Sequence, residues 1–131
     1  MNTTRHWGMG CINIAIAIAC GAFGAHALKA RVQSGTMPQA WLDVWHTAAQ
    51  YHLWHGLAIL VILLAMHTGM LRRHVTPLWG FWIGTALFSG SLYALVLSGV
   101  SGLGVITPLG GTVWILTWVY LGLMPWLPPA E

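Results

Sequence analysis

Three histidines carry the clearest potential for chemistry in this sequence, because imidazole nitrogens are common ligands of transition metals. His52 and His55 are three residues apart, so in a helix both rings lie on one face. His26, from a separate apolar stretch, can complete a set of three nitrogens of the kind that holds copper or zinc. A metal- or haem-binding site made by these side chains is therefore one hypothesis for the protein.

Two other interpretations of the polar residues stay open. The side chains can form a hydrogen-bonded layer that fixes the register of neighbouring helices, because polar groups in a bilayer must be satisfied. They can also line a pocket for a small solute or a lipid headgroup. Both interpretations bring in three residues that carry hydroxyl groups, which are Ser89, Tyr93 and Thr107.

Composition places these residues in a membrane. Only 5% of the 131 residues are charged, whereas 57% are hydrophobic. In a soluble domain about a quarter of the residues are charged. With so few charges the chain cannot cover its surface in water, so we expect one integral membrane domain, residues 1–131, with the lipid bilayer as its surroundings. The net charge of +3 is too small and dispersed to predict nucleic-acid binding.

The scarcity of acidic residues limits the possible chemistry. Asp43 and Glu131 are the only acids, and both lie outside the apolar stretches. Proton and cation transporters usually carry carboxylates inside the membrane, and hydrolases of the paired-carboxylate kind need two. A nucleophile at Ser89 would need a base and an orienting acid. We therefore do not expect an enzyme.

Four apolar stretches are long enough to cross a bilayer, since about 20 residues of helix span its hydrocarbon core. Ahead of the second stretch, Trp41 and Trp45 share a helical face with the histidines and predict an interfacial helix over residues 38–48. The expected fold is an all-α, four-transmembrane-helix up-down bundle with this interfacial helix before the second span. The expected spans are residues 7–28, 50–68, 77–98 and 108–126.

Small residues recur at four-residue spacing in two of these spans. Such spacing puts them on one helix face and lets neighbouring backbones approach closely. Asn13 belongs to the first series and can also donate and accept hydrogen bonds across an interface. The positions are Asn13, Ala17, Gly21 and Ala25 in the first span, and two separate pairs in the third, Gly80 with Gly84 and Ala86 with Gly90.

The basic residues predict the orientation. With four spans, Arg5, Arg72 and Arg73 lie on the same side as both termini, opposite Lys29 and Arg31. The positive-inside rule then favours both termini in the cytoplasm. Counting 1.5 Å of rise per residue from these ends, we expect the histidines and hydroxyl groups described above to converge in the outer leaflet.

Four short motifs, in order along nearly the whole chain, resemble the YgdD-like inner-membrane proteins. This family is catalogued as domain of unknown function 423 and is related to a small eukaryotic transmembrane protein. The motifs are GAFGAH at 21–26, WHTAAQYHLWH at 45–55, LFSGSLY at 87–93 and TPLGG at 107–111. The resemblance implies a four-span protein of the bacterial inner membrane and leaves its activity open. Family members often end in a basic tail, whereas this chain ends Pro-Pro-Ala-Glu.

These features favour a small, non-catalytic membrane protein that serves as an accessory or packing subunit of a larger assembly. Its partners are then other membrane-protein subunits or further copies of itself. The alternative is a membrane protein that binds copper, zinc or haem through His26, His52 and His55. A solute pore made by oligomers is disfavoured, because the sequence offers no ring of charges to line it.

Overall fold

The computed structural model describes residues 3–71 and 76–126 of the chain, and within them all regular secondary structure is helical. Four helical segments are long and apolar enough to cross a membrane, which confirms the predicted all-α, four-span fold. These segments are Thr4–Gln33, Gln39–His67, Pro77–Ser98 and Ser101–Leu123. Arg72 and Arg73, used above to predict orientation, lie outside the described residues.

The first span is one rod built from three consecutive helical pieces. They are α1 (Thr3–Phe23), a π-helical segment (Gly24–Leu28) and α2 (Lys29–Gln33). The π-helical segment falls on the GAFGAH motif, where Trp45 of the next helix packs against the rod. A Cβ atom on Gly24 would meet the indole ring of Trp45, so glycine is needed at this contact. Widened helical turns of this kind are rare and mark positions under local constraint.

The second span is one continuous helix, α3 (Gln39–His67), so a separate interfacial helix over residues 38–48 is not observed. Pro38 precedes α3 in an extended conformation. Trp45, expected at the membrane interface, is only 4% exposed because it packs against the first span and against Tyr93. The helical face shared by the tryptophans and histidines runs through the helix unbroken, and tertiary packing rather than lipid covers it.

The chain then forms a third span and a fourth. The third is α4 (Thr76–Ser98), and the residue directly after it, Gly99, has a φ of +77°. Glycine adopts this left-handed conformation without steric cost, as is common directly after helices. A short 3₁₀ helix (Ser101–Val105), the helix α5 (Thr107–Leu123) and a final 3₁₀ turn (Met124–Trp126) complete the described chain.

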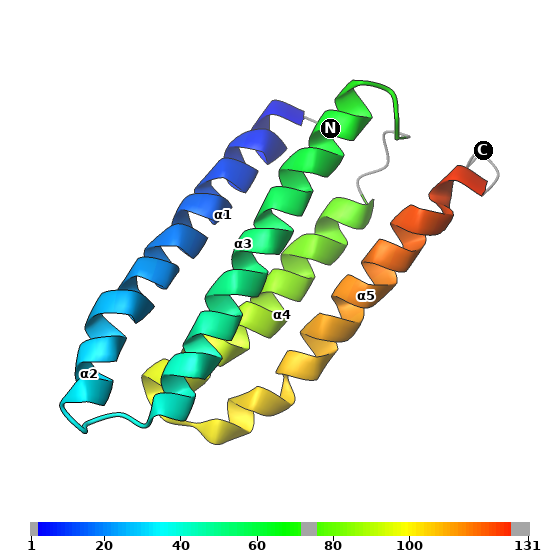
Figure 1. The fold of residues 1–131 in the computed structure, drawn as a ribbon. Coiled ribbons are helices and arrows are strands. Elements are labelled where there is room, and N and C mark those ends of the chain that lie inside the picture. The colour runs from blue at the N-terminus through cyan, green and yellow to red at the C-terminus, as the bar shows by residue number, and fades with distance from the viewer. Residues whose placement is uncertain (1–2, 72–75, 127–131) are drawn as a thin grey trace.

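The helices form an open row rather than a closed square (Figure 1). Backbones approach closely between α1 and α3, between α3 and α4, and between α4 and α5, whereas α1 makes no close backbone approach to α4 or α5. Directions alternate, so the start of α1 and the end of α5 lie at the same end of the bundle (Figure 1). The buried share of the most apolar stretch is 50% in the second span and 39% in the third, but only 22% in the first and 17% in the fourth.

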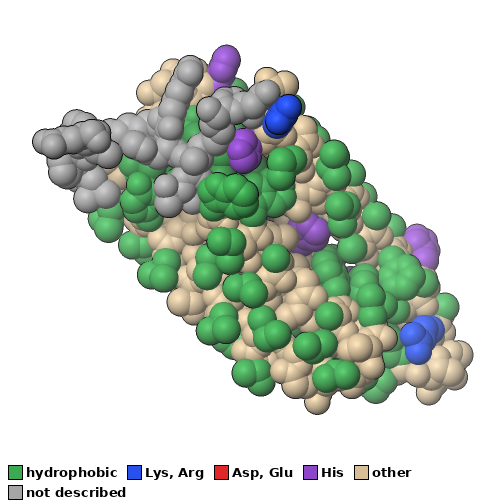
Figure 2. All heavy atoms as spheres, turned by 180° about the vertical axis from the view of Figure 1, so that it is seen from behind, with side chains coloured by type: hydrophobic (Ala, Val, Ile, Leu, Met, Phe, Trp, Pro, Cys, Tyr) green, Lys and Arg blue, Asp and Glu red, His purple; other side chains and the backbone are tan. Residues whose placement is uncertain are grey.

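Large apolar side chains fill the bundle at both ends. One cluster joins α3, α4 and α5 around the fully buried Ile59, Leu78 and Phe81. The other cluster, around Leu28 and Trp45, closes the opposite end, where α2 turns into α3. Figure 2 shows the outside of one face, on which hydrophobic side chains predominate and the basic side chains lie toward the two ends. This distribution is the one expected for a protein that spans a hydrocarbon layer.

Glycines make the close contact between α4 and α5. A Cβ atom on Gly80 would meet Thr117, and one on Gly84 would meet Trp114. On the facing helix, a Cβ atom on Gly110 would meet the backbone of Phe88. The predicted role of the Gly80–Gly84 pair in close helix packing is therefore confirmed, and the glycine of the TPLGG motif serves the same contact.

Replacing Gly110 by alanine is expected to destabilise the protein by about 1–3 kcal/mol, because backbone rather than a flexible side chain occupies the space. The measurement is the thermal unfolding midpoint of the purified protein in mild detergent. Gly122→Ala is the matched control, since no atom lies within 4 Å of its added methyl group. We expect this control to leave the midpoint unchanged or raise it, and equal losses in both variants would contradict the assignment.

Candidate functional site

His52 joins three helices through one hydrogen-bonded network. On α3, its Nε2 lies 3.0 Å from Oδ1 of Asn13 on α1, and its Nδ1 lies 3.3 Å from the hydroxyl of Tyr93 on α4. An amide oxygen only accepts hydrogen bonds, so Nε2–H donates to Asn13, and in a neutral imidazole Nδ1 then accepts from the Tyr93 hydroxyl. Both nitrogens of the ring are used. This arrangement suits a buried position from which water is excluded.

Two further hydrogen bonds tie the same helices together. Ser89 Oγ donates to the backbone carbonyl of Ala48 over 2.9 Å, which links α4 to α3. Trp45 Nε1 donates to the carbonyl of Cys20 over 2.7 Å, and its ring centroid lies 4.6 Å from that of Tyr93. Asn13, Ser89 and Tyr93 thus each make a hydrogen bond to a neighbouring helix.

His55 belongs to a different contact. Its ring stacks in parallel on the indole of Trp114 from α5, with centroids 3.6 Å apart and an interplanar angle of 1°. Its Nδ1–H donates to the carbonyl of Tyr51, one turn earlier, over 2.8 Å. Because the backbones of α3 and α5 do not approach closely, this stack of two rings bridges the space between them.

The structure does not bring the three histidines of the metal hypothesis together. His26 is exposed on the π-helical segment, whereas His52 and His55 are buried and engaged with different helices. Within residues 3–71 and 76–126, no three His, Cys, Asp or Glu side chains are grouped so that they could hold a metal ion. Thr107 is also separate, because its hydroxyl pairs with Ser91 over 2.8 Å.

The position of His52 along its helix differs from the one expected. The helix α3 begins at Gln39 rather than near residue 50, so its middle residue is Leu53. His52 is adjacent to that residue and lies about 1.5 Å from it along the helix axis. The network is therefore central in the bundle and not at the outer end of the second span.

A groove of about 300 Å³ lies beside this network, between α1 and α4, which is the gap that the open row leaves. Its lining includes Asn13, His52 and Tyr93 together with two residues that the sequence reasoning did not single out, Trp82 and Thr85. Their spacing carried a signal, since positions 82, 85, 89 and 93 follow steps of three, four and four along one helical face.

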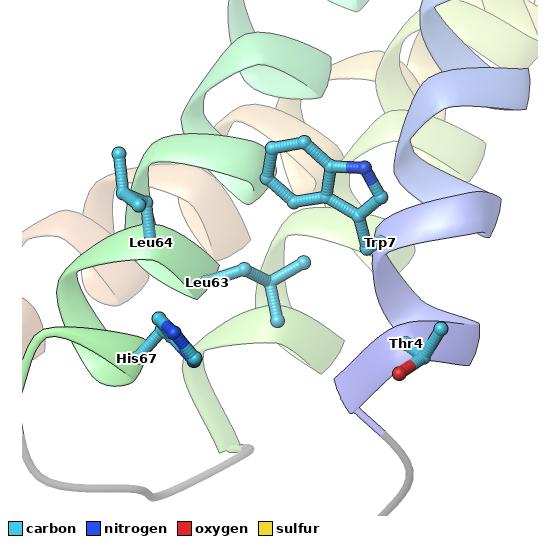
Figure 3. A pocket seen from close by; sticks show the side chains of 5 residues that line it. All are labelled: Thr4, Trp7, Leu63, Leu64 and His67. Carbon is cyan, nitrogen blue, oxygen red and sulfur yellow. The ribbon is translucent and has the colours of Figure 1, made fainter.

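Two other hollows open on the outside of α1 and α3. The larger, about 660 Å³, is lined by small residues of α1 and by His46 and Gln50 of α3. The smaller, about 280 Å³, lies where α1 begins and α3 ends. Figure 3 shows its lining side chains, which are Thr4 and Trp7 from α1 and Leu63, Leu64 and His67 from α3. Its walls are apolar, and the tryptophan at this end suits the membrane boundary.

The chemical character of the central site is neutral hydrogen bonding. Asp43, the one carboxylate among the described side chains, is exposed near the start of α3, where Gln39 donates to it over 2.9 Å. Its distance along α3 from His52 is about 13 Å, more than two helical turns. The arrangement can therefore hold helices in register and accommodate uncharged polar groups.

Comparison with known proteins identifies similar chains. The model of the family "Protein of unknown function (DUF423)" matches residues 20–111, which contain all four motifs of the resemblance described above. The UPF0382 membrane protein YwdK of Bacillus subtilis (strain 168) is 42% identical over 114 residues, which cover 86% of this chain and 89% of the relative. The UPF0382 membrane protein SAB0533 of Staphylococcus aureus (strain bovine RF122 / ET3-1) is 39% identical over 116 residues, covering 86% and 88%. No solved structure matches the chain.

Replacing Tyr93 by phenylalanine is expected to lower the stability by about 0.5–1.5 kcal/mol, because His52 Nδ1 loses its donor while the ring contacts remain. Reversible unfolding in mixed micelles measures the change. Tyr120→Phe is the matched control, since that side chain is exposed and makes no hydrogen bond within the described part of the chain. A loss of the same size in the control would show that the hydrogen bond between Tyr93 and His52 does not stabilise the fold.

Proposed function

The chain belongs to the DUF423 family, and similar chains are named membrane proteins. We propose that it acts as a non-catalytic accessory subunit of a larger assembly in the bacterial inner membrane. The proposed partner is a transmembrane helix of another subunit, which packs on the outside of α1 and α3. The observation that carries this proposal is an unpaired glutamine in the middle of a membrane-spanning helix.

Gln50 presents a polar amide on the outer surface of the bundle. The residue is exposed and makes no hydrogen bond within the described residues. It lies three residues before Leu53, the middle of α3, which is about 4.5 Å along the helix axis. An amide facing hydrocarbon at that depth is unfavourable unless another chain satisfies it. A polar side chain on a neighbouring helix would do so.

The surface around Gln50 suits the approach of a helix. Ala17, Gly21 and Ala22 of α1 line the same groove, whose volume is about 660 Å³. No atom lies within 4 Å of the place that a Cβ atom on Gly21 would occupy, so this side of α1 is open. Small residues beside a polar one are typical of transmembrane helix interfaces.

The open row of helices supports the same proposal. Among the long helices, α3 alone approaches the backbone of the first span closely, and 22% of the most apolar stretch of this span is buried inside the protein. Most of its surface therefore faces lipid or another protein. The absence of catalytic function is part of the proposal, and its support is that the Ser89 hydroxyl is committed to the backbone carbonyl of Ala48.

The metal- or haem-binding alternative has less support, because His26 is exposed and distant from the network around His52. Elemental analysis and an absorption spectrum of protein extracted from its native membrane test it directly. Stoichiometric copper, zinc or haem that His52→Ala removes would restore this alternative.

The accessory role predicts that a photo-reactive amino acid at position 50 crosslinks to a defined protein chain in the native membrane. The partner is identified by mass spectrometry after extraction into polymer nanodiscs. A partner subunit in constant ratio is the expected result. Recovery of a monomer that crosslinks only to lipid would contradict the proposal, and a crosslink to a second copy of this chain would replace the partner subunit by a homo-oligomer.

Two substitutions sharpen this experiment. Gln50→Leu and Gly21→Leu are expected to release the partner without lowering the unfolding midpoint, because neither position makes a hydrogen bond or a close contact inside the protein. Gln33→Leu is the matched control, since Gln33 is exposed at the end of α2, away from the groove. The control should retain the partner.

The proposed orientation places both termini in the cytoplasm. Its support is that Arg5 lies at the end of the bundle that holds both the start of α1 and the end of α5, opposite Lys29 and Arg31 (Figure 1). A green fluorescent protein fused to the C-terminus should therefore fluoresce in bacteria, and alkaline phosphatase fused there should be inactive. The reverse pair of results would invert the topology.

A further inference from the structure

The polar groove between α1 and α4 contains buried groups whose hydrogen-bonding capacity is unused. Thr85 is 8% exposed and Asn13 is 9% exposed, yet Thr85 Oγ1 and Asn13 Nδ2 have no hydrogen-bond partner in the part of the chain that the structure describes. Trp82 Nε1 is buried without a partner as well. All three residues line the same groove. Orphaned polar atoms are costly inside a protein, and more so inside a membrane.

Thr85 stands apart from the other hydroxyl-bearing residues of its helices. Every other serine and threonine of α4 and α5 whose side chain is described makes a hydrogen bond, and several bond to the carbonyl one turn earlier. The carbonyl one turn before Thr85 belongs to Phe81. This carbonyl accepts a hydrogen bond from Trp114 Nε1 over 3.4 Å and none from the Thr85 hydroxyl. The Thr85 hydroxyl is therefore left for another molecule.

The unused groups define what that molecule must offer. Trp82 Nε1–H and the Asn13 amide can only donate, and the Thr85 hydroxyl can donate or accept. The ligand must therefore carry acceptor oxygens. No Asp, Glu, Lys or Arg among the described residues lines the groove, so the ligand must also be uncharged. The remaining walls, including Ile16, Ala86 and Gly90, suit a flat apolar body.

The position of the groove in the bundle and its volume narrow the class of ligand further. Thr85 lies two residues from the middle of α4, at residue 87, which is about 3 Å along the axis. The ester carbonyls of glycerolipids belong to the interface, about 15 Å from the midplane. A volume of about 300 Å³ is at the lower end of the range for small-molecule sites. On the open side Ile16 is 51% exposed and Ala86 is exposed, which leaves a route from the lipid.

We propose that this groove binds an uncharged, membrane-soluble carbonyl compound, with a quinone ring as the occupant that its depth favours. The carbonyl oxygens accept hydrogen bonds from Trp82 Nε1 and Thr85 Oγ1, and the ring lies over Ala86 and Gly90. Asn13, held by His52, forms the facing wall from α1. The groove is distinct from the surface around Gln50 that the accessory role uses, so each proposal can fail without the other.

The test measures binding of decylubiquinone to the full chain in lipid nanodiscs, from the rise in the unfolding midpoint with ligand concentration. Dioctanoylglycerol is titrated in parallel as the glycerolipid source of the same carbonyl chemistry. Saturable binding is expected, tighter for the quinone. Thr85→Val and Trp82→Phe should each weaken it by about 3- to 10-fold, the effect of one lost hydrogen bond. Ala86→Leu, which fills the groove, should abolish it.

The controls separate binding from folding. Thr85→Val leaves the shape intact and removes a hydroxyl that has no partner, so the midpoint without ligand should not fall. Thr112→Val and Trp79→Phe, outside the groove, should bind as the unchanged protein does. If dioctanoylglycerol binds, decylubiquinone does not, and the groove variants weaken the binding, the groove is a glycerolipid site. No binding of either probe, binding that no groove variant alters, or a protein chain crosslinked at position 86 would overturn the proposal.

Discussion

A polar group in a hydrocarbon layer has no water to bond with, so it must find its partner in the protein or in another molecule. Most of the bundle obeys this constraint internally. His52 uses both ring nitrogens, Ser89 reaches the backbone of the neighbouring helix, and Trp45 reaches the carbonyl of Cys20. These bonds join α1, α3 and α4, whereas close glycine contacts join α4 and α5. Close glycine contacts also join the first span to α3, as at Gly24, and hydrogen bonds also join α4 to α5, as between Ser91 and Thr107. Both kinds of contact therefore set the register on either side of α4.

The polar groups without a partner lie on the two sides of α1, which the open row of helices leaves uncovered. Because α1 and α4 do not approach closely, a groove remains between them, and the unpaired atoms of Asn13, Trp82 and Thr85 belong to residues that line it. On the opposite side of α1, Gln50 is unpaired beside small residues. A closed bundle would have buried or excluded these groups. The same architecture thus explains why α1 can be both a structural element and a surface for other molecules.

The fold was predictable because hydrophobic length and small-residue spacing are local properties of the sequence. The four spans follow from apolar stretches, and the packing role of Gly80 and Gly84 follows from their spacing. The start of α3 was not predictable in this way, since Trp41 and Trp45 are as typical of a membrane interface as of a core. Only the packing of Trp45 against Gly24 and Tyr93 decides between the two. For the same reason, the sequence did not reveal that His52 lies in the middle of α3.

For the site, residue types could be predicted but their pairing could not. Two of the three histidines are indeed buried, yet His52 and His55 face different helices, because a step of three residues on a helix turns the side chain by about 60°. That rotation is enough to send one ring to Asn13 and the other to Trp114 when the neighbours stand in a row. Hydroxyl residues behave alike: Ser89 and Ser91 are two positions apart, and they bond to α3 and to Thr107 respectively. Thr85 differs from both because the backbone acceptor nearest to it is already taken, which no spacing in the sequence reveals.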